Sequence, residues 1–256
     1  MKYCISYYKN FRHLAEVDEI IFPYSDNLPA YFEEKQFDNK QRILIHVGKR
    51  SLSEVMPILK KIESIHSNMA IIVDRHMMKP EGIQFFYSDY CKTFDQVYSF
   101  IQEGVSDVYV VESLGFILKD IGTYCHDHNV NVRVLPNVLQ SSLGSTSRLP
   151  QVCQFFIRPQ DTYAYEDFVD VFELFGDEEK LSVTYEIYKE QKWNDDFMFL
   201  IKGITQPMDL SSNFPLFVDY RLKCGQKCYN CNICTRLKDF NTQLTKAGLE
   251  VKHKEE

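Results

Sequence analysis

Short apolar runs recur along the chain, and longer polar or amphipathic segments separate them. The runs are rich in β-branched and aromatic residues and are bounded by turn-forming residues, which is typical of the buried strands of a parallel sheet. We therefore predict strands at residues 3–8, 19–24, 42–47, 68–74, 83–87, 107–111, 130–135 and 153–157.

Three of the intervening segments have the apolar face of an amphipathic helix. The first covers residues 52–67, where Ser51 is placed to cap the helix and Glu54 to complete a capping box. The other two cover residues 93–103 and 114–128. Strands that alternate with helices in this way predict an α/β fold.

The predicted strands are numerous enough for a (β/α)8-type barrel, and an open doubly wound sheet is the alternative. The pattern has one defect, because residues 75–82 are too few to form a crossover helix between the fourth and fifth runs. Either one barrel helix is missing there, or the two runs form one bent element. Residues 169–175 supply either a replacement strand or the end of a helix that begins at Tyr163. We therefore expect an irregular or incomplete barrel.

The chain divides into two predicted domains. Residues 1–176 form the barrel, and residues 177–256 form a helical, cysteine-rich extension that packs back on it. Residues 139–150 are rich in Ser, Gly and Thr and predict a long loop. After a strand of an α/β barrel, such a loop would lie at the active face.

Composition places the chain among ordinary globular proteins. It has 256 residues, of which 45% are hydrophobic and 25% charged. The formal net charge of −7 argues against a protein dedicated to coating nucleic acid or a membrane surface, although a local site for RNA or DNA stays open. No apolar run reaches transmembrane length, and the first residues do not resemble a signal peptide. We therefore expect a cytoplasmic protein with no membrane partner and with reduced thiols.

Half of the eight cysteines stand close together, as Cys224, Cys228, Cys231 and Cys234. Thiolates at this density are ligands for zinc or for iron–sulfur clusters. Structural zinc usually takes two Cys-x2-Cys pairs separated by a dozen or more residues, whereas ferredoxin-type runs also place cysteines two and three residues apart. The spacing therefore favours a 4Fe–4S cluster, with zinc as the alternative and unpaired structural thiols as the simplest interpretation. Cations that would stabilise such an anionic site, or hold a phosphate instead, surround it: Arg221, Lys223, Lys227, Arg236 and Lys238.

Polar residues that follow predicted strands are candidates for catalysis, because the C-terminal ends of barrel strands form the active face. The four that we select are Asp74, His76, Glu112 and Arg158, from a wider set that adds Tyr24, His46, Arg75, Asp89 and Asn137. Asp74 and His76 would supply a base and a metal ligand, and Arg158 would bind an anionic substrate. The simpler alternatives are a turn with solvated charges for Asp74 and His76, and a structural salt bridge for Arg158. For His46, inside an apolar run, a buried and hydrogen-bonded imidazole is the simpler interpretation.

One stretch resembles a known family. Residues 104–115, Gly-Val-Ser-Asp-Val-Tyr-Val-Val-Glu-Ser-Leu-Gly, with residues 130–135 and Gln140, resemble the peptidase U32 family over about a third of the chain. The resemblance implies a barrel-type α/β domain, a four-cysteine iron–sulfur cluster in several members, and peptide degradation or oxygen-independent hydroxylation of RNA and quinones. The family's cysteine-containing signature is not recognisable here, and its cluster ligands are dispersed rather than clustered. No family catalytic residue is therefore carried over.

A second, lower-ranked resemblance concerns the cysteine spacing. Cys224, Cys228 and Cys231 are similar to the Cys-x3-Cys-x2-Cys motif of radical SAM enzymes. Those enzymes carry the motif after the first barrel strand, whereas here it follows the last. Cys234 would also fill the iron site that SAM needs open.

Two main hypotheses of function follow. The leading one is a U32-like barrel enzyme with a four-cysteine metal site that acts on a peptide or nucleic-acid substrate. The competing one is a non-catalytic barrel in which a structural zinc site holds the C-terminal extension and the surface binds a protein partner.

Overall fold

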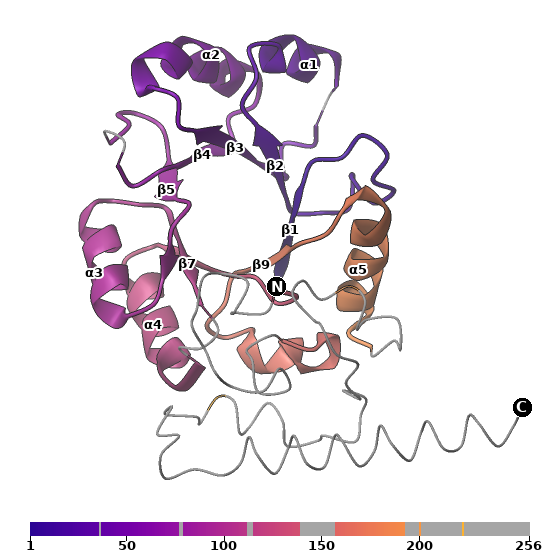
Figure 1. The fold of residues 1–256 in the computed structure, drawn as a ribbon, viewed down its shortest axis with the longest axis vertical. Coiled ribbons are helices and arrows are strands. Elements are labelled where there is room, and N and C mark those ends of the chain that lie inside the picture. Colours follow the sequence, from indigo (N-terminus) through magenta and orange to yellow (C-terminus); the bar gives the residue numbers. More distant parts are fainter. Residues whose placement is uncertain are drawn as a thin grey trace, which may run out of the picture.

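The structure is a computed structural model that describes residues 1–35, 37–76, 79–111, 115–138 and 157–192, together with Leu200 and Leu222. The described strands surround a central axis, and the α-helices lie outside them (Figure 1). Every described strand pair is parallel. The predicted α/β barrel is therefore confirmed.

The strands form one sheet in the order β5-β4-β3-β2-β1-β9-β8-β7-β6. The two ends of this sheet are consecutive along the chain, with only Ser88 and Asp89 between them, so the barrel is nearly closed. The Ser106 N–H donates to the Phe85 carbonyl at 2.8 Å and ties β5 to the start of β7 across the seam. The strand bounds are β1 Lys2–Ser6, β2 Glu19–Pro23, β3 Arg42–Gly48, β4 Met69–Val73, β5 Phe85–Tyr87, β6 Tyr90–Cys91, β7 Asp107–Val110, β8 Asn131–Val134 and β9 Val171–Leu174.

The helices of the described residues follow most of the predicted positions. They are α1 Leu28–Glu34, α2 Leu52–Ile65, α3 Phe94–Gln102, α4 Gly115–Asp127, the 3-10 helix η4 Pro159–Tyr165 and α5 Glu178–Glu190. Within this part of the chain, no helix has the length and apolar character needed to cross a bilayer.

The helix starts differ in how they are capped. The Thr93 hydroxyl accepts a hydrogen bond from the Gln96 N–H at 3.3 Å and caps α3. The capping box predicted at Ser51 is wrong, because the Ser51 side chain makes no cap hydrogen bond and contacts the Ser53 hydroxyl at 3.2 Å instead. The serine hydroxyl therefore bonds to a neighbouring side chain rather than to the helix backbone.

The expected irregularity lies between β4 and β5. These strands pair directly with each other, and the described residues of the connection contain no helix. The connection is short and includes Pro80 and Gly82, the latter at a φ of +78°. The missing-helix alternative is therefore the correct one, and the bend in the chain falls instead between β5 and β6.

The barrel is completed by segments near the end of the described chain. β9 lies between β8 and β1, so residues 169–175 supply a strand rather than the end of a helix. Of the eighth predicted strand, residues 153–156 lie outside the described residues, and Ile157 is not in a strand. Helix α5, the first part of the predicted extension, buries Leu181 and Tyr185 in the barrel core, and the Tyr188 carbonyl accepts from the Tyr3 hydroxyl at 2.9 Å.

The close packing of α4 generates a testable prediction. A Cβ added at Gly122 would stand 2.4 Å from the Phe168 Cβ and 2.6 Å from the Phe168 carbonyl oxygen. We expect Gly122→Ala to lower the free energy of unfolding by about 1–3 kcal/mol, because this clash outweighs the gain in helix propensity. Denaturant unfolding measures the change, with the exposed neighbour Thr123→Ala as control. A Gly122→Ala variant at least as stable as the wild type would contradict this packing.

Candidate functional site

Charged side chains meet inside the barrel. Residues that pair across neighbouring strands point to the same side of the sheet. Glu19 is in register with Cys4 and with Arg42, and Cys4 is in register with Glu173. Asp107, which binds Arg42, and Arg133, which binds Glu19 and Asp107, join them from β7 and β8. The resulting interior charge cluster consists of Glu19, Arg42, Asp107, Arg133 and Glu173.

Close pairing holds most of this cluster together. Arg42 binds Asp107 through both of its Nη atoms, each 2.8 Å from a carboxylate oxygen. Arg133 Nη1 lies 2.5 Å from Glu19 Oε2 and 3.2 Å from Asp107 Oδ1. Arg133 is fully buried, and its guanidinium lies over the Phe86 ring, 5.1 Å from the centroid. Charges removed from water in this way need such partners, because an unpaired buried charge is strongly destabilising.

The pairing decides the protonation of the acidic residues. Burial favours the neutral form of Asp107, but Arg42 and Arg133 hold the pKa of its carboxyl below the usual value. Burial raises the pKa of the Glu173 carboxyl above the usual value, because Arg133 and the Tyr109 hydroxyl offset the loss of solvation only in part. Glu173 therefore binds a proton more readily than an ordinary glutamate does, and Asp107 binds one less readily than an ordinary aspartate.

Polar contacts close the interior at the N-terminal ends of the strands. The Ser106 hydroxyl donates to Asp107 at 2.7 Å, and the Asn131 amide donates to the same carboxylate at 3.2 Å. Arg42 also donates to the Gln84 side chain at 3.2 Å. This end of an α/β barrel generally serves stability, and these contacts fit that role.

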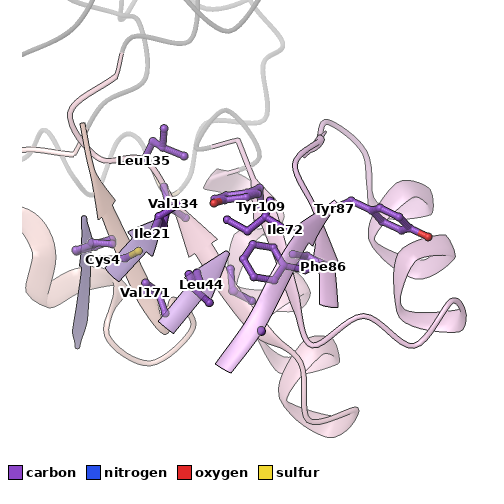
Figure 2. Close-up of a cluster of buried hydrophobic side chains, with 14 of the residues drawn as sticks. Cys4, Ile21, Leu44, Ile72, Phe86, Tyr87, Tyr109, Val134, Leu135 and Val171 are labelled. Carbon is purple, nitrogen blue, oxygen red and sulfur yellow. The ribbon is translucent and has the colours of Figure 1, made fainter. Parts of the chain in front are cut away.

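Side-chain exposure increases toward the C-terminal end of the barrel. On the inner face of β9, exposure rises from 0% at Val171 to 16% for the Glu173 side chain, and Phe175, which follows the strand, is 42% exposed. On β3, Leu44 is buried, whereas His46, two residues further, is exposed. The apolar middle layer includes Leu44 together with Ile21, Ile72, Phe86 and Tyr109 (Figure 2). Among the described residues, the inner side chains therefore become more exposed toward the C-terminal ends of the strands.

Of the predicted catalytic residues, Asp74 and His76 form a turn after β4. The Asp74 carboxylate, which is half-buried, accepts from the His76 N–H at 3.3 Å, and His76 is exposed. The intervening Arg75 leaves the barrel and lies over the Phe100 ring of α3, 4.8 Å from the centroid. Asp74 directly follows Val73, the last residue of β4, so it stands at the C-terminal end of this strand.

Arg158 and Asn137 make structural contacts. Arg158 is 2% exposed, and its Nε and Nη2 atoms both donate to the Asp161 carboxylate at the start of η4. Asn137 is fully buried and exchanges two hydrogen bonds with the Phe175 backbone, accepting at 2.9 Å and donating at 2.6 Å. These contacts join the segment after β8 to the end of β9. The pair of Arg158 with Asp161 fits the structural salt bridge that was the alternative interpretation of Arg158.

The remaining predicted site residues lie outside the described residues. They are Glu112 and the four clustered cysteines, Cys224, Cys228, Cys231 and Cys234. Within the described part of the chain, no group of three or more His, Cys, Asp or Glu side chains is arranged to hold a metal ion. The described cysteines Cys4, Cys91 and Cys125 are buried and unpaired.

His46 differs from its expected environment. The sequence predicted a buried, hydrogen-bonded imidazole, but His46 is exposed at the C-terminal end of β3. It lies on the inner face, because it pairs with Ile72 in a register that continues the row of Leu44 and Ala70. Nearby protein still removes enough solvent to lower the pKa of the imidazole, so the ring is neutral at pH 7. His46 therefore joins Asp74 among the polar groups at this end of the barrel.

Sequence reasoning missed the interior residues. Glu173 accepts a hydrogen bond from the Tyr109 hydroxyl at 2.5 Å, and the Tyr90 ring lies 5.2 Å from the Tyr109 ring. The available signal was a charge within an apolar run, as at Arg133 and Glu173. Charged residues are rarely buried without a partner, so a charge inside a predicted strand is as good a candidate site residue as a polar residue at a strand end.

A surface hollow lies elsewhere. It has a volume of about 320 Å³ and is formed by α1, the end of α2 and the segment between α1 and β3. Its lining residues are Phe32, Glu33, Lys35, Phe37, Asn39, Ile65 and His66, none of which was a predicted site residue. This hollow is outside the barrel and separate from its C-terminal end.

Comparison with known proteins adds no relative. No family model matches the chain, and no curated protein matches it. The U32-like relationship therefore stays a prediction.

The proton-binding behaviour of Glu173 predicts a pH dependence of stability. A carboxyl whose pKa is raised by folding contributes stability at low pH, and this contribution is lost as the pH rises through the folded-state pKa. Gln resembles the protonated carboxyl, so we expect Glu173→Gln to become more stable than the wild type as the pH increases from about 5 to 8. Each unit of pKa elevation corresponds to about 1.4 kcal/mol.

Denaturant unfolding of both proteins across this pH range measures the difference. Glu103→Gln is the matched control, because Glu103 also accepts a 2.5 Å hydrogen bond from a tyrosine, Tyr87, but outside the barrel interior. A stability difference between Glu173→Gln and the wild type that does not change with pH would show that Glu173 does not carry the proton.

Proposed function

We propose that this chain is an α/β-barrel enzyme that acts at the C-terminal end of its barrel. We further propose that it carries a metal centre on Cys224, Cys228, Cys231 and Cys234. The observation that carries the proposal is the contrast between the two ends of the barrel interior. The N-terminal end is closed by a hydrogen-bonded charge cluster, whereas the inner face becomes exposed and polar toward the C-terminal end.

The C-terminal end offers groups for acid–base chemistry. His46 lies on the inner face near the end of β3, and Asp74 directly follows β4. The lowered pKa of His46 keeps its imidazole neutral and able to accept a proton. Parallel barrels place catalytic residues at this end, on several different strands. The predicted roles of His76, Glu112 and Arg158 remain part of the proposal, although Arg158 already has a carboxylate partner in Asp161.

The metal centre is proposed from the sequence. Four thiolates spaced as Cys-x3-Cys-x2-Cys-x2-Cys are a complete donor set for a 4Fe–4S cluster, and zinc is the alternative. A cluster would supply electron transfer, whereas zinc in a four-thiolate site would have a structural role. Together with the U32-like stretch, this favours a peptide or RNA substrate. A non-catalytic barrel that binds a protein partner is the competing function.

Metal analysis tests the proposed centre. We expect anaerobically purified protein to contain iron and sulfide in equal amounts and to show the visible absorption of an iron–sulfur cluster. Replacement of any one of the four cysteines by Ser should lower the metal content, because each supplies one ligand. Cys125→Ser is the control and should retain the metal, since Cys125 is buried in the barrel. Metal-free wild-type protein would refute the proposed centre, and stoichiometric zinc would select the structural alternative.

Turnover tests the proposed enzyme. The metal-loaded protein is incubated with peptide and RNA panels, and Asp74→Asn is expected to reduce any turnover by about 100-fold or more, as for loss of an acid–base group. Asp120→Asn, at an exposed position on α4 outside the strands, is the matched control. Unchanged turnover in Asp74→Asn would remove this residue from the mechanism. A stable protein that binds zinc and turns over neither panel would favour the binding-module alternative.

A further inference from the structure

The interior charge cluster contains one more acid than base. Arg42 and Arg133 supply two positive charges, and Asp107 and Glu19 are their close partners. Glu173 is the third carboxyl, and its nearest cationic atom, Arg133 Nη2, lies 3.6 Å away from Oε2. That separation is an ion-pair distance but exceeds the range of a good hydrogen bond. Glu173 is therefore the carboxyl whose charge the cluster does not balance.

Glu173 is also the carboxyl that can be reached. Its side chain is 16% exposed, compared with 1% for Glu19 and 0% for Asp107. The chain becomes more exposed just beyond it, at Phe175, the residue that follows β9. A group that enters from the C-terminal end of the barrel therefore meets Glu173 before the rest of the interior charge cluster.

The contacts of Glu173 leave one of its oxygens for a ligand. The Tyr109 hydroxyl and Arg133 Nη2 both approach Oε2, at 2.5 and 3.6 Å. Arg133 Nη2 has no hydrogen-bond partner among the described residues, so it offers an additional donor to an ionised Glu173. These two groups would hold the carboxylate from its inner side, and Oε1 is the remaining acceptor.

Aromatic rings line the same region. Tyr90 and Tyr109 are neighbours in register on β6 and β7, with ring centroids 5.2 Å apart. Burial and the neighbouring Glu173 raise the pKa of Tyr90, so its phenol stays neutral. A cation is attracted to the faces of such rings as well as to a carboxylate. An ionised Glu173 would repel an anion, and Arg133 is fully buried, although its Nη2 has no hydrogen-bond partner among the described residues.

We propose that Glu173 and Tyr90 form a binding site for an organic cation, a primary ammonium or a guanidinium group, that enters from the C-terminal end of the barrel. This inference deepens the proposed function by naming a substrate class for the same end of the barrel. When the cation binds, the Glu173 O–H bond breaks and its proton passes to the solvent. The carboxylate that results pairs with the cation, which keeps all of its own protons, so binding releases one proton.

Calorimetry of the full chain tests the site with defined probes. The probes are n-butylamine and agmatine as cations, with butyrate and n-butanol as the matched anion and neutral compound. We expect both cations to bind and the other two to bind weakly or not at all. Titrations in buffers of different ionisation enthalpy report the number of protons released, and the expected value approaches one per cation at a pH below the Glu173 pKa.

Variants locate the site. Glu173→Gln should weaken cation binding by about tenfold or more and abolish proton release, because it removes the charged partner. Tyr90→Leu should weaken binding without abolishing proton release. Glu103→Gln removes the same charge at a position outside the barrel interior that also accepts a tyrosine hydrogen bond, so it should bind as the wild type does. Equal binding by Glu173→Gln, or equal loss in Glu103→Gln, would overturn the site.

The affinity for the cations should rise with pH until Glu173 is fully ionised. The groups that act directly on Glu173 are Cys4, Glu19, Tyr90, Tyr109 and Arg133, and Arg42 and Asp107 lie behind them in the interior charge cluster. Raised pKa values keep the thiol, the phenols and the guanidiniums protonated, and a lowered pKa keeps Asp107 ionised. Affinity that falls with pH, or tighter binding of butyrate than of the cations, would refute the proposal.

The outcomes separate this inference from the proposed function. Cation binding at Glu173 in a protein that lacks metal and turnover would leave the inference standing and refute the enzyme. Turnover by a metal-loaded protein that binds neither cation would support the enzyme and refute the inference.

Discussion

The barrel depends on pairing two guanidiniums with carboxylates in an interior that water does not reach. Arg133 is fully buried, and removal of one partner from such a pair typically costs about 3–5 kcal/mol because the other charge stays buried. The pairs join strands that are distant along the chain, since Arg133 meets Glu19 and Arg42 meets Asp107. These charges can therefore be buried only if the sheet closes. Their pairing also favours the observed strand register over other registers, which would move each guanidinium away from its carboxylate.

The same constraint divides the barrel into two ends with different tasks. Hydrogen bonds from Ser106 and Asn131 complete the coordination of Asp107, so the N-terminal end is occupied by its own side chains. Glu173 lies at the boundary, held by Tyr109 on one side and partly exposed on the other. Protonation of Glu173 therefore changes the stability of the barrel interior, because the same carboxyl is part of the interior charge cluster and partly exposed at the C-terminal side.

Much of the fold was predictable because local patterns determine it. Apolar periodicity predicted seven of the strands that the structure contains. It also predicted the helices that follow Ser51, Thr93 and Leu114. β6, only Tyr90–Cys91, was missed because two residues carry no periodic signal. The choice between a missing helix and a bent strand at residues 75–82 stayed open, since it depends on whether β4 and β5 pair directly, and pairing is a property of the whole sheet.

The candidate site was harder to predict because its partners are distant in sequence. Arg158 followed a strand and was selected, but Asp161, three residues later, binds it, and Arg75 is held by α3 in a similar way. The interior partners are separated by 114 residues in one pair and 65 in another, so no local pattern reveals them. A charge inside a buried strand nevertheless implies a partner somewhere across the barrel. Where acids outnumber bases among such charges, as they do here, the surplus acid must take its balancing positive charge from a proton or from a ligand.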